Sequence, residues 1–293
     1  MNRNLHYLRG NGWCLRGEYN TSMVDAAISV GPRIRAWRQT RGLSQFELAS
    51  RAGFSTRHVS FIETGRARPS REAVLALGEV LDLSLRDRNR LLEAAGFAHI
   101  FRETPLSADE MTHMRGKLQF ILDRHLPYAA VALDRYSNIL LENCAAGRFL
   151  QAVMSPSLIA PPSNLLRATF HPEGSRRWIV NWLEVEWHLL NQAERVLGST
   201  DDSVGAALLA EIRGYASASE MANSHTALRP LDLLLPIHIR KGELDLRLFS
   251  AIMTLGTPQD VTLQELRIET YFPADQESEL CWQKNFAESA PVE

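Results

Sequence analysis

Residues 31–70, GPRIRAWRQTRGLSQFELASRAGFSTRHVSFIETGRARPS, carry the strongest local signals in this chain. Ser44 stands three residues before Glu47, which is the spacing of a capping box at a helix start. Gly53 follows a short segment with an apolar side and can end that helix, since glycine accepts a left-handed backbone. Ser55 can then cap a second short helix. Two short helices around a glycine-containing turn predict a helix-turn-helix, although an ordinary helical hairpin is the alternative.

The second of these helices exposes polar side chains near its start, where a helix-turn-helix presents side chains to the major groove of DNA. These side chains are Thr56, Arg57, His58 and Ser60. The loop after the helix contains Arg66 and Arg68, and both suit contact with DNA phosphates, which fixes the register without reading sequence. Two solvated arginines are the alternative for that loop.

The same segment resembles the XRE or lambda-repressor-like helix-turn-helix family over about residues 31–95. The resemblance rests on Leu-Ser-Gln at the start of the first short helix, on Ala-x-x-x-Gly, on the Glu-x-Gly after the second, and on Arg-Pro-Ser. It implies a five-helix, all-α DNA-binding domain in which Gln45 braces the DNA backbone and Thr56, Arg57 and His58 start the recognition helix. It also implies a buried structural ion pair between Arg38 and Glu63. We also predict that Ser55, just before that helix, belongs to the DNA-binding residues.

The charge of the chain is divided between its two parts. Residues 1–100 hold 15 Arg, no Lys and 9 acidic residues, a net charge of +6, whereas residues 101–293 hold 17 basic and 25 acidic residues, a net charge of −8. This asymmetry favours a DNA-binding module followed by a module that stays off DNA. The three cysteines are far apart, and no apolar run is long enough to cross a membrane, so we expect a cytoplasmic protein without a membrane partner.

Composition and turn signals divide the chain into five parts. We expect a flexible N-terminal arm, a helix-turn-helix domain, a linker with a connector helix at about 107–125, a second domain, and a polar tail. Their predicted boundaries are 1–24, 25–98, 99–126, 127–275 and 276–293.

The second domain has the pattern of an α+β fold. Two strands at 128–133 and 138–142 form a hairpin, and three strands are predicted at 231–240, 243–255 and 262–272. A helical middle, 143–225, separates them and is interrupted by the proline-rich stretch 155–164. The last strand alternates apolar and polar residues, which indicates a sheet with one covered face. Five antiparallel strands with a helical insertion form a PAS-like layout with a small-molecule pocket.

Three stretches of this domain resemble the MmyB-like regulator family, in which a helix-turn-helix precedes a PAS-like ligand-binding domain. They are PYAAVALDRYSNILLENCAAGRFL, NLLRATFHPEGSRRWIVNW and GTPQDVTLQELRIETYFPAD. The resemblance covers about residues 31–276, and the chain departs from it at Tyr128, since the family usually has Pro-Ala near the first strand. A member of that family holds a fatty acid, so the resemblance implies a small apolar, fatty-acid-like ligand.

Within the second domain, the segment 164–182 combines apolar residues with cations and hydrogen-bond donors. Arg167 could meet a carboxylate in bidentate geometry. The predicted ligand-binding residues are Arg167, Phe170, His171, Trp178, Asn181 and Trp182. The alternative is structural: Arg167 pairs with an acidic residue, His171 and Asn181 bridge loops, and the tryptophans belong to the core.

No nucleophile motif, phosphate-binding loop or metal-ligand spacing appears in the sequence, so we predict no catalytic residue, no metal and no cofactor. Cys144 is an inert thiol or a redox sensor. We therefore predict a homodimeric transcription regulator that binds double-stranded DNA and responds to a small apolar ligand. A haem- or flavin-binding PAS sensor is the first alternative, and an acyl-processing enzyme with a DNA-binding appendage is the second.

Overall fold

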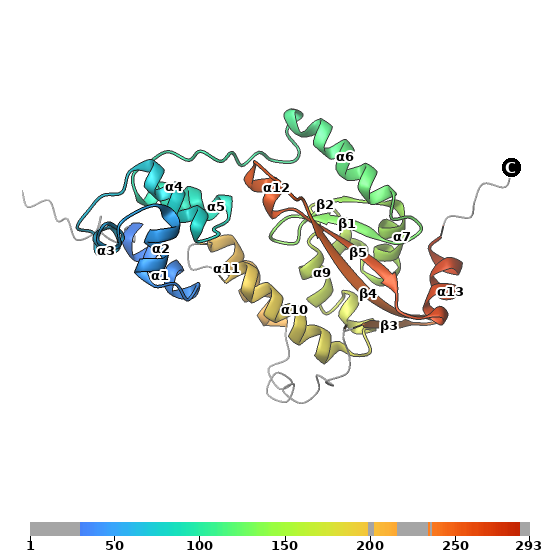
Figure 1. Cartoon of the computed structure of the whole chain (residues 1–293). Coiled ribbons are helices and arrows are strands. Elements are labelled where there is room, and N and C mark those ends of the chain that lie inside the picture. Colours follow the sequence, from blue (N-terminus) through green and yellow to red (C-terminus); the bar gives the residue numbers. More distant parts are fainter. Residues whose placement is uncertain (1–29, 199–201, 216–233, 235, 288–293) are drawn as a thin grey trace, which may run out of the picture. The chain divides into compact units, whose positions relative to one another are not determined.

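The structure is a computed structural model that describes residues 30–198, 202–215, 234 and 236–287 (Figure 1). The chain forms two compact units, Met1–Ile100 and Phe101–Glu293. The boundary between them falls two residues beyond the predicted end of the helix-turn-helix domain. The predicted N-terminal arm, 1–24, lies outside the described residues, as do 216–225 of the predicted helical middle.

The described part of the first unit consists of helices, as expected for a lambda-repressor-like domain. Their bounds are α1 Val30–Thr40, α2 Gln45–Ala52, α3 Thr56–Glu63, α4 Arg71–Val80 and α5 Leu85–Ala94.

Four of these helices begin at a serine whose side chain accepts a hydrogen bond from the backbone N–H three residues on. The capping serines are Ser44, Ser55, Ser70 and Ser84. At Ser44 the predicted capping box is complete, because the Glu47 carboxylate also accepts from the Ser44 N–H at 2.8 Å. Gly53 ends α2 with φ of 75°. Local hydrogen bonding thus sets where these helices start, as the sequence predicts at Ser44 and Ser55.

Gly31 is the second residue of α1. It lies inside α1 and against the end of α3, where an added Cβ would approach the Ile62 carbonyl oxygen to 2.3 Å. Glycine is therefore needed for close packing of the two helices. Ile34, Leu48 and Val59 are fully buried in the core that results.

The second unit is built on a five-stranded antiparallel sheet, which confirms the predicted α+β class and strand number. The strand order is β2-β1-β5-β4-β3, with bounds β1 Ala130–Leu133, β2 Ile139–Glu142, β3 Ile237–Lys241, β4 Leu244–Thr254 and β5 Arg267–Pro273. The first hairpin pairs with the last strand: Ala132 lies opposite Ile268 across β1 and β5. The sheet is therefore joined in its centre by a pairing between strands that lie far apart in the sequence.

Helices before, between and after the strands complete this unit. Their bounds are η2 Asp109–Met111, α6 Thr112–Asp123, α7 Cys144–Val153, α8 Pro156–Ile159, α9 Leu165–Phe170, η3 Ser175–Trp178, α10 Trp182–Leu197, α11 Ser203–Tyr215, α12 Val261–Glu265 and α13 Gln276–Asn285. The stretch 155–164, predicted to lack regular structure, contains the single turn α8, with Pro156 at its permitted first position.

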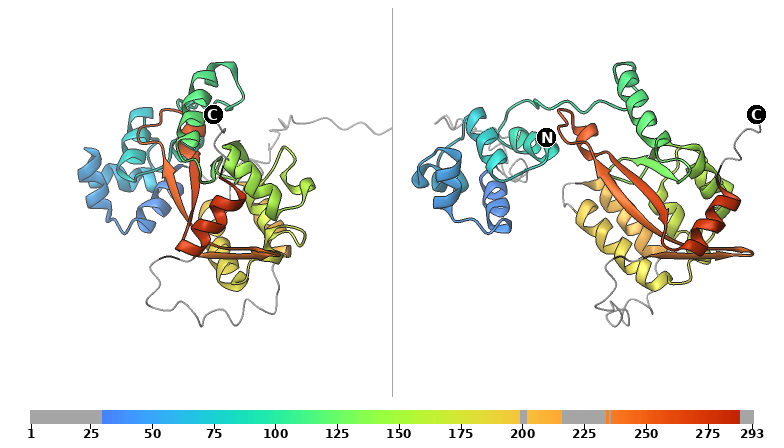
Figure 2. Two further views of the ribbon diagram at one scale, coloured as in Figure 1. Left: turned by 90° about the vertical axis from the view of Figure 1, so that its right-hand side faces the viewer. Right: turned by 45° about the vertical axis from the view of Figure 1, so that its right-hand side comes forward.

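Both faces of the sheet are covered, which corrects the expectation of one covered face. Ala130 and Ala132 of β1 pack against α6, whereas Val131 and Leu133 pack against the helices of the insertion. Figure 2 shows α6 on one side of the sheet and the α9–α10 region on the other. The helix predicted as a connector is therefore part of the second unit, since Leu118 and Leu122 of α6 are fully buried.

Two further predictions at the C-terminal end were wrong. The segment 261–265 is the short helix α12, started by the Asp260 side chain, so β5 begins only at Arg267. The residues 276–285, predicted as a polar tail, form α13, and Trp282 on it is fully buried. Trp282 and Phe286 stand one helical turn apart and give this mostly polar segment a narrow apolar face.

Candidate DNA-binding and ligand-binding sites

A buried ion pair joins the helices of the helix-turn-helix. The Arg38 guanidinium donates to Glu63 from Nε at 2.6 Å and from Nη2 at 3.0 Å. The Gln45 amide donates to the same carboxylate at 2.8 Å. The hydrogen bonds to Glu63 raise the pKa of Arg38. The structure therefore contains the predicted pair and adds Gln45 to it, so α1, α2 and α3 meet at one carboxylate.

The outer face of α3 presents the polar side chains expected to meet DNA. Thr56 and Arg57 are exposed, whereas His58 and Ser60 are half-buried. The Arg57 guanidinium lies 5.1 Å from the centre of the Phe61 ring. An arginine held in this way keeps its hydrogen-bond donors at the surface, where a base or a phosphate can meet them.

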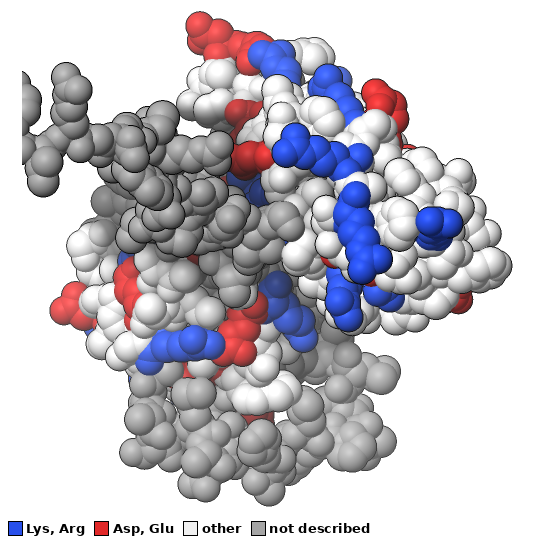
Figure 3. Space-filling model, turned by 90° about the vertical axis from the view of Figure 1, so that its left-hand side faces the viewer, with Lys and Arg blue, Asp and Glu red and all other residues white. Residues whose placement is uncertain are grey.

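Three further predicted residues flank this helix. The Ser55 hydroxyl is the N-cap and accepts from the His58 N–H at 3.2 Å, so its first role is to start α3. Arg66 and Arg68 are both exposed in the loop that follows. On the face drawn in Figure 3, basic side chains lie mostly among uncharged neighbours, and acidic side chains are also present. Such a surface suits an anionic partner.

The second unit contains a cavity of about 100 Å³ between the sheet and the helices of the insertion. Most of its walls are apolar. The aliphatic and aromatic part of the lining comprises Phe149, Leu150, Val153, Met154, Leu165, Leu166, Ile179, Leu189, Ala193, Val196, Leu197, Ile237, Ile239 and Leu248. This composition suits the apolar body of a small ligand.

Part of the cavity lining is polar, and three of its polar residues alternate along β5. Arg267, Glu269 and Tyr271 all line the cavity. Ile268 and Thr270 between them are buried on the other face of the sheet. Because successive side chains of a strand point to opposite faces, the charged residues of β5 face inward together. We call Arg267, Glu269 and Tyr271 the β5 strip.

The β5 strip is held by neighbouring groups but not fully satisfied. Arg267 donates to the Asp134 carbonyl oxygen at 3.2 Å and to the Ser137 hydroxyl at 2.7 Å, while its buried Nε has no hydrogen-bond partner among the described residues. Burial raises the pKa of Glu269, and nearby Arg267 opposes that rise. Burial and the adjacent Glu269 raise the pKa of Tyr271 well above its usual range.

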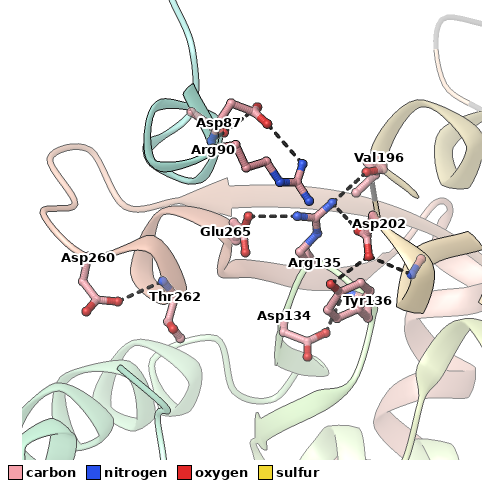
Figure 4. A network of polar contacts seen from close by, with 12 residues as sticks. Asp87, Arg90, Asp134, Arg135, Tyr136, Val196, Asp202, Asp260, Thr262 and Glu265 are labelled. Carbon is pink, nitrogen blue, oxygen red and sulfur yellow. Dashed lines mark hydrogen bonds and ion pairs between the residues drawn. The ribbon is translucent and has the colours of Figure 1, made fainter. Parts of the chain in front are cut away.

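Arg135, in the β1–β2 turn, also lines the cavity and ties three segments together (Figure 4). It pairs with Asp202 at 2.7 Å and with Glu265 at 3.2 Å, and it donates to the Val196 carbonyl oxygen at 3.4 Å. Asp202 stands just before α11 and Val196 at the end of α10. The network therefore fastens the α10–α11 hairpin, which supplies part of the cavity lining, to the sheet.

The sequence matches two known families in the order that these two units suggest. Residues 29–91 match a helix-turn-helix domain, and residues 114–283 match the MmyB-like transcription regulator ligand binding domain. The second match covers the sheet, the insertion and the cavity. The chain belongs to the MmyB-like transcription regulators.

The regulator is also similar to three curated proteins, each named an uncharacterized HTH-type transcriptional regulator. One is from Mycobacterium bovis and two are from strains of Mycobacterium tuberculosis. Each is 30% identical over 119 residues, which is 38% of this chain and 46% of the relative. The match thus spans about half the length of these relatives.

None of the six predicted ligand-binding residues lines the cavity of the regulator, so the lining differs from the predicted set. Arg167 is bound to Glu211 by two hydrogen bonds, at 2.6 Å and 2.9 Å. Each partner shifts the other, so the pKa of Glu211 is lowered and that of Arg167 is raised. Arg167 therefore pairs with an acidic residue, as the structural alternative in the sequence analysis predicts.

The other five predicted residues support the core or connect segments. Phe170 is fully buried against the edge of Trp182, at 5.2 Å between ring centres. Asn181 donates to the Pro236 carbonyl oxygen and accepts from the His238 N–H, so it bridges to β3.

The remaining two also meet neighbouring side chains. His171 accepts from the Glu173 N–H and packs on Tyr215. Trp178 packs beside the cations Arg177 and Lys241.

Sequence reasoning missed the β5 strip. Apolar and polar residues alternate over 266–272, and this pattern has two interpretations. The polar residues face either water or an internal cavity. Arg-x-Glu-x-Tyr on a strand of a domain predicted to hold a pocket would have favoured the second interpretation. Glu211, the partner of Arg167, gave no such signal, because 44 residues separate the two.

The described residues contain no group of three His, Cys, Asp or Glu side chains placed to hold a metal ion. Among those same residues, no helix is both long enough and apolar enough to span a membrane. Cys144 is exposed and its sulfur accepts from Arg148 at 3.7 Å, whereas Cys281 is half-buried; Cys14 lies outside the described residues.

Replacing Asp202 with alanine is expected to loosen the α10–α11 hairpin. The change removes the pair with Arg135, the hydrogen bond from the Tyr136 hydroxyl at 3.1 Å, and the cap on the Gly205 N–H at 3.0 Å. We expect the free energy of unfolding to fall by about 1–3 kcal/mol. Urea unfolding followed by far-UV circular dichroism measures it.

Glu194→Ala is the matched control for Asp202→Ala. It removes another ion pair of the same hairpin, with Arg213 at 2.6 Å, but both side chains of that pair are about half exposed. An exposed pair contributes little, so the control should change the free energy by less than about 0.5 kcal/mol. Equal effects of the two substitutions would show that the buried network does not hold the hairpin.

Proposed function

We propose that this regulator binds a two-fold DNA operator as a homodimer in the cytoplasm, and that a small apolar, fatty-acid-like ligand in its second unit modulates the binding. The observation that carries the proposal is the cavity with apolar walls and one polar wall, in a chain that also has a helix-turn-helix with an exposed α3. A ligand with an apolar chain and one polar end matches this division.

The DNA-reading residues of the proposal are those at the start of α3 and around it. Thr56, Arg57, His58 and Ser60 would face base edges in the major groove, with Ser55 at the start of the helix. Gln45, held by Glu63, would brace the backbone at the start of α2. Arg66 and Arg68 would contact phosphates. Two helix-turn-helix units in a dimer require DNA half-sites about 10 base pairs apart, or a multiple of that spacing.

Replacing Arg57 with alanine is expected to weaken operator binding about tenfold to a hundredfold, because a base contact by arginine contributes about 1–3 kcal/mol. The operator is first selected from a random DNA pool with the full-length protein. Fluorescence anisotropy at fixed salt then gives the dissociation constants.

Arg124→Ala is the matched control for Arg57→Ala. Arg124 also stacks on a phenylalanine of its own helical segment, at 4.8 Å from the Phe120 ring, but it lies in the second unit. This variant loses the same kind of intramolecular contact and should keep operator affinity. If Arg57→Ala binds as tightly as Arg124→Ala, α3 does not read DNA through Arg57.

The ligand part of the proposal has its own test. Mass spectrometry of small molecules extracted from the purified protein should find an amphiphile with an apolar chain. Adding that compound back to stripped protein should change the operator dissociation constant. A visible absorption spectrum of the same preparation tests the haem or flavin alternative, which requires a coloured protein. Recovery of only strongly polar compounds would contradict the proposal.

A further inference from the structure

The polar wall of the cavity has a charge balance that bears on which ligand fits. Among the described residues that line the cavity, the charged or titratable side chains are Arg135, Arg267, Glu269 and Tyr271. Arg135 already pairs with two carboxylates, those of Asp202 and Glu265. Its positive charge is therefore offset before any ligand arrives. The other charged groups of the lining are Arg267 and Glu269, both in the β5 strip.

Within the β5 strip, a cation and a carboxyl group stand two residues apart on the same face of one strand. Their Cα atoms are thus about 7 Å apart, since a strand rises about 3.4 Å per residue. An anionic head at this wall would be attracted by Arg267 and repelled by Glu269. At such similar distances the two effects nearly cancel. A free carboxylate consequently gains little from the strip.

An uncharged headgroup with both a hydrogen-bond acceptor and a donor can form hydrogen bonds with the same strip. The buried Nε atoms of Arg135 and Arg267 have no hydrogen-bond partner among the described residues, and a carbonyl oxygen can accept from such a donor. Glu269 can accept from an N–H or O–H of the head. A protonated Glu269 still keeps an acceptor oxygen, so the fit holds in both of its protonation states.

We infer that the β5 strip is the headgroup site of the cavity and that Glu269 makes it select an uncharged head with adjacent acceptor and donor, such as an acyl amide, over a free fatty acid. The inference rests on the proposed function, because it assumes an apolar-chain ligand in this cavity. It adds the chemical class of the head and the residue that discriminates between heads.

Burial of Glu269 adds a dependence on pH to this selection. Burial raises the pKa of Glu269, against the lowering effects of Arg267 and of hydrogen bonds from Tyr271 and Ser250. When Glu269 carries its proton, a carboxylate can approach it and accept a hydrogen bond. When Glu269 loses the proton as the pH rises, the repulsion appears. Acid binding should weaken with rising pH, while amide binding should stay constant.

The test compares decanamide with decanoic acid, which share a chain length and differ in the head. Isothermal titration calorimetry on the stripped full-length protein gives both dissociation constants at the lowest and the highest pH at which the protein stays folded. At the higher pH we expect decanamide to bind at least about tenfold more tightly, because the amide both accepts and donates hydrogen bonds at the strip, while the opposite effects of Arg267 and Glu269 on the acid nearly cancel. The ratio should shrink at the lower pH through stronger binding of the acid.

Glu269→Gln removes the charge at nearly constant shape and keeps both an acceptor and a donor. In this variant decanoic acid should bind about tenfold more tightly at the higher pH, and the preference for the amide should nearly disappear. Glu277→Gln is the matched control, since its side chain is 90% exposed and does not line the cavity. A thermal melt of each variant checks that it is folded.

The outcomes separate the inference from the proposed function. If decanoic acid binds at least as tightly as decanamide at the higher pH, the inference about the head is wrong and the apolar-ligand proposal stands. The inference is also wrong if Glu269→Gln changes the ratio no more than Glu277→Gln does. If neither compound binds wild-type protein, both the inference and the apolar-ligand proposal are contradicted.

Discussion

Replacing Glu63 with alanine is expected to lower the free energy of unfolding of the helix-turn-helix unit by about 3–5 kcal/mol, because it leaves a buried guanidinium without its partner. The Arg38 and Glu63 side chains are only 11% and 1% exposed. The substitution also removes the acceptor of Gln45 at the start of α2. One carboxylate thus connects three helices, so its loss should affect all of them.

Hydrogen exchange followed by mass spectrometry on the full-length protein measures this effect, because it reports amides of 30–100 separately from those of the second unit. Exchange should accelerate in α1, α2 and α3 and stay unchanged in the sheet. Glu79→Ala, at an exposed position of α4, is the control and should change little. Similar exchange in both variants would mean that the pair is not a main support of this unit.

Replacing Trp282 with alanine is expected to destabilise the second unit by about 3–5 kcal/mol, as large-to-small changes of buried aromatic residues do. Its indole N–H donates to the Pro127 carbonyl oxygen at 2.9 Å. Its ring lies 5.4 Å from that of Phe149 and 4.8 Å from that of Phe286. The change therefore leaves a cavity and an unpaired carbonyl group beside the first strand.

Urea unfolding followed by far-UV circular dichroism is the measurement for Trp282→Ala, since the substitution itself alters tryptophan fluorescence. Leu280→Ala is the control, because Leu280 lies on the same helix and is 65% exposed. It should change the free energy by less than about 0.5 kcal/mol. A fall of less than about 1 kcal/mol in the free energy of unfolding for Trp282→Ala would agree with the predicted polar tail. It would contradict a structural role for α13.

The helix-turn-helix was predictable nearly residue by residue. Its helices start at Ser44, Ser55, Ser70 and Ser84, and each cap joins atoms only three residues apart. Such interactions join only neighbouring residues, so they can be recognised without the rest of the chain. The partnership of Arg38 with Glu63 came instead from the family resemblance, because nothing local joins residues 25 apart.

The ligand site was predictable only as a class of site. Strand positions and the helical insertion indicated a PAS-like pocket, but the residues chosen for it, from Arg167 to Trp182, proved to support the helices around the cavity. Arg167 pairs with Glu211, and Phe170 packs on Trp182. Apolar and basic residues near a predicted pocket can either line the pocket or pack the helices around it. Sequence spacing does not distinguish these two roles.

By itself, the sequence determined the starts of α2 and α3 in the first unit, the number of strands in the second, and the family of the chain. Only the tertiary structure decided that α6 and α13 cover the sheet, and that Arg267, Glu269 and Tyr271 face a cavity instead of water. The alternation along β5 places these three side chains on one face. Which face is buried depends on the pairing of β5 with β1 and β4 and on the helices packed above it. The pairing with β1 joins parts of the chain more than a hundred residues apart.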